Sequence, residues 1–321
     1  MGRRIALLSV ALLCAGCAPF DSPRPPLDEE RESPATQVTS GRSGEDRDPE
    51  ISPDGRTLYY ASSSHGATLD LYMRTVGSNS AIRLTTSPGD KRFPKLNPAD
   101  GRTLAFCTNA RGEWEIALIN SAGDPGRVQY VSEPGMQSLH PSWSPDGTKL
   151  VYCATEDLAS GEWVLKVRDF RTGRTHTFEE VDGLLPEWSP RGDTIVFQRM
   201  KRRDGWYGAI WTAEFEAGVV RNLTAVFSSD DWAAINPSWS PDGRWIVFAT
   251  VAKSPSHAGI LDRGDDLWAV RPDGSHATRL TTSAAADWMP VWSTDGTIYF
   301  VSDRSGTQRI WGLVPRGLES P

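Results

Sequence analysis

The sequence predicts an all-β protein whose body is a six-bladed β-propeller, and three observations lead to this prediction. A proline-led motif, PSWSPDG at Pro141 and Pro237, has relatives at Pro49, Pro94, Pro186 and Pro290, spaced 45, 47, 45, 51 and 53 residues apart. Each copy is followed by short apolar segments separated by turn-forming residues, with no helical period between them. A repeat of this length with four short strands is typical of a propeller blade.

The strands of one repeat can be assigned in order from the innermost strand outward. In the first repeat we expect them near residues 49–51, 58–60, 69–76 and 82–87. The Ser-Pro-Asp-Gly step between the first two strands fits a type I turn, because Pro presets φ and Gly accepts a positive φ. We therefore expect the motif aspartates to form turns, and the motif tryptophans to pack between blades. Calcium binding by these aspartates is the alternative, and it would need six to eight converging oxygens.

The last repeat is too short to form a whole blade. Only 31 residues follow Pro290, and its fourth strand is missing. Residues 36–48 restore the missing length, and Gln37–Ser40 (QVTS) is similar to Arg279–Thr282 (RLTT). We therefore predict that the N-terminal strand completes the last blade and closes the ring, which spans residues 36–321.

The N-terminus has the features of an export signal. Residues 1–16 combine Arg3 and Arg4 with an apolar run, and Ala15-Gly16-Cys17 resembles a bacterial lipobox. This predicts lipidation at Cys17 and a protein anchored on the periplasmic or outer side of a membrane in the bacterial cell envelope. Ordinary signal cleavage without a lipid is the alternative. Residues 17–35 are acidic and proline-rich, and are expected to act as a linker or as a disordered leader.

The composition argues against some classes of partner and site. The formal net charge of −7 argues against a nucleic-acid partner, which usually requires a basic surface. Besides Cys17 and the neighbouring Cys14, the chain has only Cys107 and Cys153, at equivalent positions of two repeats, so we expect two buried free thiols. No Cys or His cluster has zinc-site spacing, and no metal or cofactor is predicted.

The PxWSPDG turns, the aromatic second strands and the LTTS segments together resemble the TolB-like (WD-repeat-like) β-propeller family. The resemblance covers residues 36–321. It implies a six-bladed propeller in a lipoprotein variant that lacks the N-terminal α/β domain of TolB. Propellers of this kind serve in scaffolds, lyases and peptidase appendages, so the resemblance specifies the fold more closely than the function.

Candidate binding residues lie in the loops that share one face of such a propeller. Exposed Trp and Arg favour a protein interface, whereas Trp beside Asp favours sugar binding. Tryptophans that cover the blade seams are the alternative. The candidates are Asp90, Lys91, Arg92, His140, Arg202, Trp206, Tyr207, Asp231, Trp232, Asp287 and Trp288.

A catalytic role has weaker support in the sequence. No G-x-S-x-G motif is present, which argues against a serine hydrolase. His65, His140 and His257 could share the ligand face with acidic residues. The sequence therefore favours a monomeric, non-catalytic envelope lipoprotein that binds a protein or a glycan. A polysaccharide lyase or glycoside hydrolase on the same scaffold is the alternative.

Overall fold

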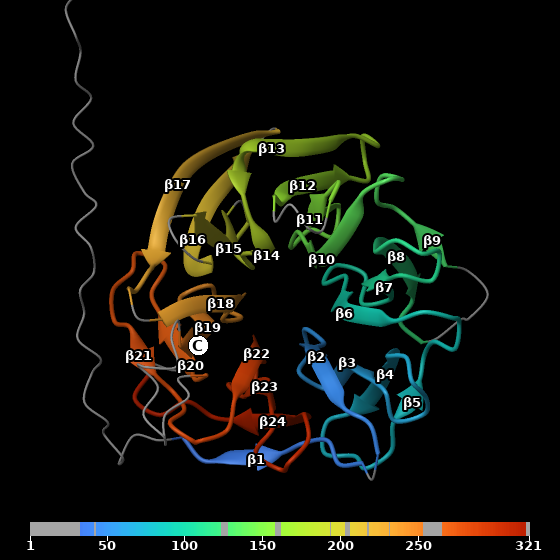
Figure 1. The fold of residues 1–321 in the computed structure, drawn as a ribbon, viewed down its shortest axis with the longest axis vertical. Coiled ribbons are helices and arrows are strands. Elements are labelled where there is room, and N and C mark those ends of the chain that lie inside the picture. The colour runs from blue at the N-terminus through green and yellow to red at the C-terminus, as the bar shows by residue number, and fades with distance from the viewer. Residues whose placement is uncertain are drawn as a thin grey trace, which may run out of the picture.

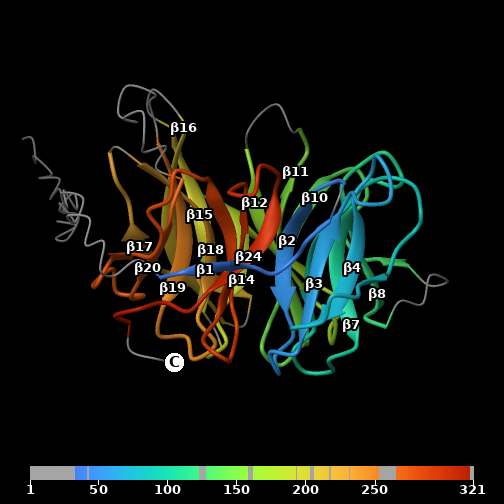
Figure 2. The ribbon, with the colours of Figure 1, turned by 90° about the horizontal axis from the view of Figure 1, so that it is seen from below.

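Six four-stranded antiparallel sheets surround a central axis, which confirms the predicted six-bladed propeller (Figure 1). The computed structural model describes residues 33–41, 43–122, 128–157, 162–192, 194–202, 206–216, 218–230, 232–252 and 265–318. Seen from the side, the blades form a disc (Figure 2). Within these residues no helix is long and apolar enough to cross a membrane.

Each blade contributes one strand to each of four concentric layers. The innermost strands are β2 (Asp46–Ile51), β6 (Lys91–Leu96), β10 (Gln137–Trp143), β14 (Leu184–Trp188), β18 (Trp232–Trp239) and β22 (Asp287–Trp292). The second strands are β3 (Thr57–Ser62), β7 (Thr103–Thr108), β11 (Lys149–Thr155), β15 (Thr194–Arg202), β19 (Ile246–Ala252) and β23 (Ile298–Ser302). The third strands are β4 (Asp70–Thr75), β8 (Glu115–Asn120), β12 (Val164–Asp169), β16 (Trp206–Glu216), β20 (Leu267–Val270) and β24 (Arg309–Leu313). The outer strands are β5 (Ile82–Arg83), β9 (Gln129–Tyr130), β13 (Thr175–Asp182), β17 (Val219–Phe227), β21 (Thr278–Arg279) and β1 (Ala35–Gln37).

The motif tryptophans pack between blades, as predicted. Trp143 and Trp239 are 7% and 5% exposed. The Trp143 indole donates a hydrogen bond to the Lys95 carbonyl of the preceding blade at 3.1 Å, and Trp239 donates to the Glu187 carbonyl at 3.2 Å. Each of these rings therefore adds apolar burial and satisfies a backbone acceptor across a blade seam.

The motif aspartates form the predicted turns. The Ser52 hydroxyl donates to the Asp54 carboxylate at 2.6 Å, and the Arg56 amide donates to the same carboxylate oxygen at 3.1 Å. Gly55 completes this turn with a φ of 70°. The first of these bonds recurs at the same distance between Ser144 and Asp146 and between Ser240 and Asp242.

The N-terminal strand closes the ring, as predicted. β1 pairs with β24, with Ala35 opposite Leu313 and Gln37 opposite Trp311. The paired strand lies earlier than the expected residues 37–40. The reason is local, because the Val38 and Thr39 amides both donate to the same Ile310 carbonyl, and this ends the regular ladder.

Two further sequence predictions can be located. Cys107 and Cys153 are free and buried, which confirms the prediction made for them. The export signal, Cys17 and residues 17–32 of the linker lie outside the described residues and stay predictions.

Candidate functional site

Every innermost strand carries a β-bulge where its sequence reads X-Pro. The pairing register shifts at this point in all six blades. The residue before each proline has a φ between 49 and 56°, a left-handed conformation that non-glycine residues rarely adopt. These residues are Asp48, Phe93, His140, Leu185, Asn236 and Met289. Bulges redirect the chain and are frequent next to binding sites.

The bulged strands line a central channel with two cavities. The larger, about 300 Å³, lies at the end where the strands enter the Ser-Pro turns, and we call it the turn cup. It is lined by Glu50, Lys95 and Glu187, by the turn prolines Pro53, Pro98, Pro145, Pro190 and Pro241, and by neighbouring strand residues. The smaller, about 70 Å³, is lined by the six left-handed residues and the prolines that follow them, and we call it the loop cup.

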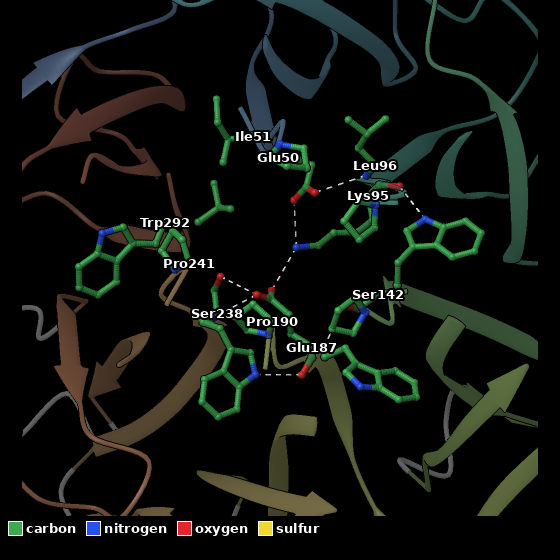
Figure 3. Close-up of a pocket in the computed structure, with 17 residues that line it drawn as sticks. Glu50, Ile51, Lys95, Leu96, Ser142, Glu187, Pro190, Ser238, Pro241 and Trp292 are labelled. Atoms are coloured by element: carbon green, nitrogen blue, oxygen red, sulfur yellow. Dashed lines mark hydrogen bonds and ion pairs between the residues drawn. The ribbon is translucent and has the colours of Figure 1, made fainter. Parts of the chain in front are cut away.

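A lysine bridges two carboxylates across the channel between the two cups (Figure 3). The Lys95 ammonium lies 3.1 Å from a Glu50 oxygen and 3.1 Å from a Glu187 oxygen. The three residues come from blades 1, 2 and 4, and Lys95 and Glu187 line both cups. We call them the channel triad. It carries one net negative charge when all three groups are ionised.

The Glu187 carboxylate also holds neighbouring blades together. A Glu187 oxygen accepts hydrogen bonds from the Ser238 hydroxyl at 2.9 Å and the Trp239 amide at 3.0 Å. In the same way the Ser142 hydroxyl accepts from the Trp188 amide at 3.0 Å. These acceptors occupy one position of the repeat, directly after the leading proline. This position therefore faces the channel and can also bond to the next blade.

Burial and neighbouring charges shift the pKa values of Glu50 and Lys95 in the channel triad. Burial raises the pKa of Glu50, and the neighbouring Glu187 carboxylate raises it further, against the opposing effect of Lys95. Burial alone would lower the pKa of Lys95, but the carboxylates of Glu187 and Glu50 outweigh it and raise this pKa above its usual value. Lys95 is therefore an ammonium at any physiological pH.

The loop cup is organised around a closed ion pair. Arg92 donates from two guanidinium nitrogens to the two Asp48 oxygens, each at 2.9 Å. The same guanidinium lies 4.3 Å from the centre of the Phe93 ring, and that ring centre lies 4.1 Å from the centre of the His140 ring. The charges at this end are therefore paired with each other and covered by rings.

His140 is held in its neutral form. Its amide donates to the Cys107 sulfur at 3.2 Å, and its Nδ1 lies 3.3 Å from the Cys153 sulfur. Burial and the nearby Arg92 charge lower the pKa of His140 to about 3. Burial raises the pKa of Cys107, and it raises that of Cys153 to about 12. In the described part of the chain, no three His, Cys, Asp or Glu residues group in a way that could hold a metal ion.

The structure brings two of the predicted site residues together and places two others, Lys91 and Asp287, inside the blades. Arg92 and His140 meet at the loop cup, as described above. Lys91 is fully buried with its ammonium 3.2 Å from Asp70, and Asp287 is fully buried against Arg304 at 2.6 Å. Asp90 is half-buried in the loop before β6, where its carboxylate accepts the Leu69 amide at 2.8 Å and so ties this loop to the chain before β4.

The remaining candidates lie in blades 4 to 6. Trp288 is half-buried and packs against the core between blades 5 and 6, and Trp232 is half-buried at the start of β18. Arg202 pairs with Trp206 in the strand ladder at the free end of the long hairpin of blade 4 (Figure 2), and Tyr207 follows next to them. Asp231 and His257 lie outside the described residues.

The channel triad was not among the residues predicted from the sequence, although the repeat holds a signal for it. The residue after the leading proline reads Glu, Lys, Ser, Glu, Ser and Val in the six copies. The proline before this residue is constant, and the residue directly after it is Trp in four of the six copies. Variation at one inward-facing position of a repeat therefore marks the residues that line the axis.

Comparisons with known proteins agree with this architecture. No known family profile matches the chain. An uncharacterized protein of Agrobacterium fabrum is 35% identical over 116 residues, or 36% of this chain. A TolB homolog of Chlorobium luteolum is 28% identical over 156 residues, or 38% of this chain. Each match spans 34% of the relative's length, so this chain covers about a third of the curated relatives it matches.

Solved structures match over most of the chain. A putative TolB from Agrobacterium tumefaciens is 21% identical with a TM-score of 0.62, over 85% of this chain and 91% of that one. An oligogalacturonate lyase from Vibrio parahaemolyticus is 16% identical with a TM-score of 0.60, over 89% and 95%. TolB from Acinetobacter baumannii is 17% identical with a TM-score of 0.61, over 84% and 65%. The chain has a TolB-like six-bladed β-propeller fold.

Proposed function

We propose that this chain is a non-catalytic binding protein of the bacterial cell envelope, anchored to a membrane through a lipid on Cys17. We further propose that the turn cup receives a protein partner. The observation that carries the proposal is a cavity of about 300 Å³ on the propeller axis with two carboxylates and one ammonium at its floor. The export signal and the TolB-like fold support the envelope location and a binding role.

The lining of the turn cup favours a basic side chain from the partner. Ile51, Leu96 and Val291 line its walls together with the turn prolines, and they offer apolar surface beside Ser142 and Ser238. The floor offers two carboxylates to one ammonium. The aliphatic stem of a lysine or arginine would lie on the walls, and its charged head would reach the carboxylates. A cavity of this size accommodates one or two side chains, and this favours a protein segment over a glycan chain.

The test is capture of a partner by cross-linking in envelope extracts. Glu50→Gln with Glu187→Gln keeps the hydrogen-bond acceptors but removes the negative charge, and we expect it to lower capture about tenfold. Glu113→Gln, at an exposed loop position, is the matched control and should leave capture unchanged. Trp232→Ala with Trp288→Ala should also retain capture. Loss with the tryptophan variant and not with the glutamate variant would move the binding face to the loop end.

The alternative function is polysaccharide cleavage on the same scaffold. It is supported by the similarity in fold to an oligogalacturonate lyase. Incubation with oligogalacturonate, with and without added manganese, would reveal it as unsaturated products. Turnover that His140→Asn abolishes would replace the binding proposal with an enzymatic one.

A further inference from the structure

A third cavity lies outside the channel, at the seam where the chain closes the ring. It has a volume of about 690 Å³ and lies between blade 1 and the last blade. Its lining comes from β1, from the end of β4, from β23 and from the segment after β24. Figure 1 shows β1 lying along β24 next to blade 1. We call this cavity the seam groove.

A buried arginine of the seam groove has no negative partner among the residues that the structure describes. Arg74 is only 8% exposed, and one of its guanidinium nitrogens donates to the Val38 carbonyl at 2.9 Å. Its Nε is buried without a hydrogen-bond partner, and no described carboxylate lies within ion-pair distance of it. A buried cation without an anion is costly, and most buried arginines are paired.

The arginine occupies a position that is apolar in most blades. Arg74 pairs with Leu58 across β3 and β4. The residues at the matching positions of blades 2, 4, 5 and 6 are Ile119, Ala213, Val270 and Leu313. Blade 3 has Arg168, which donates to the Thr175 hydroxyl at 3.3 Å and does not line the groove. Packing of the blade therefore does not require an arginine at this position.

The charged residues that line the groove are Arg74, Arg316 and Asp295, which together give one net positive charge. Arg316 is exposed at the groove, and its side chain forms no ion pair with any residue that the structure describes. Asp295 supplies the opposite charge, and one of its oxygens accepts the Thr297 amide at 2.9 Å. Val76, Tyr299 and Val314 add apolar lining, and Val314 is 59% exposed.

From these observations we infer that the seam groove binds a small organic monocarboxylate. The guanidinium groups of Arg74 and Arg316 supply the charge that recognises its carboxylate, and the apolar lining receives its body. One net positive charge matches a carboxylate better than a phosphate monoester, which carries nearly two negative charges at neutral pH. The site is independent of the turn cup and of the function proposed for it.

The test uses 4-phenylbutyrate as the probe, with the full chain labelled with ¹⁵N-arginine. We expect saturable binding that shifts the Nε resonance of Arg74. This resonance is assigned by its absence from the spectrum of Arg74→Met. Arg316→Met, at an exposed site, should weaken binding about tenfold, as expected for loss of one charged hydrogen bond. Arg168→Met is the matched control and should bind as the wild type does.

Three outcomes would overturn the inference. The neutral analogue 4-phenylbutyramide could bind as tightly as the acid, which would show that charge is not recognised. Phenyl phosphate could bind more tightly than the carboxylate, which would assign the site to a different anion. In the third outcome, Arg74→Met fails to fold, but two other variants bind the probe as Arg168→Met does. These are Arg316→Met and Arg74→Lys, which keeps the positive charge near β1. In that case Arg74 would serve only to hold β1.

Discussion

The two ends of the central channel use neighbouring positions of one repeat in different ways. The residue before the leading proline lines the loop cup, where strained backbone meets a closed ion pair and a neutral histidine. The residue after the same proline lines the turn cup, where Lys95 is shared by two carboxylates. Unneutralised charge is therefore concentrated at the turn end, whereas conformational strain is concentrated at the loop end.

This difference determines what each end can do. At the loop end the charges of Arg92 and Asp48 are already neutralised by each other and covered by aromatic rings, so a ligand would gain little from them. At the turn end one negative charge remains in excess beside a larger cavity, so a cation can still be attracted.

Removing the lysine of the channel triad should have the largest effect on stability. Lys95→Met leaves Glu50 and Glu187 facing each other with no cation between them, and we expect the free energy of unfolding to fall by about 3 kcal/mol. Urea denaturation measures this loss. Arg56→Met, at an exposed position of the first turn, is the control and should change the value by less than about 0.5 kcal/mol. Equal effects of the two variants would contradict the special role of the turn end.

The second prediction concerns coupling within the channel triad. Adding Glu50→Gln to Lys95→Met removes one of the two unpaired carboxylates, and we expect about half of the lost stability to return. The same Glu50→Gln change in the wild-type background should be close to neutral or destabilising, because it removes one partner of Lys95. Additive effects in this double-mutant cycle would show that the three groups act independently.

The fold could be predicted from the sequence because each repeat carries the same turn-forming residues at the same positions. Six Pro-led motifs and the short last repeat together required closure by the N-terminal strand, and β1 fulfils that requirement. The exact paired residues were not predictable, because the shift to Ala35–Gln37 arises from two amides that share the Ile310 carbonyl.

The candidate site was predictable only in part, for a physical reason. Lys91 and Asp287 are charged loop residues in the sequence, and their burial depends on partners 21 and 17 residues away, Asp70 and Arg304. Glu50 and Glu187 come close to each other only because six blades close into a ring. No local sequence pattern shows which inner positions face each other across the axis. Only the variation at the position after the proline pointed to them.

The third prediction is that acid affects the two ends with opposite sign. Because the pKa of His140 is about 3 in the folded protein, an unfolded chain with an ordinary histidine binds an extra proton between pH 6.5 and 3. Stability should therefore fall on acidification through this window, by at most about 1.4 kcal/mol per pH unit for this one group. His140→Asn keeps a residue that tolerates a positive φ, and it should flatten the slope.

Two comparisons accompany the pH experiment. His276→Asn makes the same change at an exposed position that also has a positive φ, and it should change the free energy of unfolding by less than about 0.5 kcal/mol. Because the pKa of Glu50 is raised in the folded protein, the fold binds its proton more readily than the unfolded chain does. This group alone therefore favours folding as the pH falls through its folded pKa from above. Glu50→Gln should accordingly steepen the loss of stability in acid, and an unchanged slope in both variants would contradict the assignment.

The smallest expected effect isolates the backbone strain of the loop end. Met289 has a φ of 53°, a conformation that costs most residues about 1 kcal/mol, but Asn tolerates it and occupies the equivalent place in blade 5 as Asn236. Met289→Asn should therefore change the free energy of unfolding by less than about 0.5 kcal/mol, because relief of strain offsets lost apolar contact. Met289→Val, which keeps an apolar side chain but is β-branched, should destabilise by about 1 to 2 kcal/mol. If Val were tolerated as well as Asn, packing rather than backbone conformation would determine the residue at this position, and the contrast between the two ends would rest on charge alone.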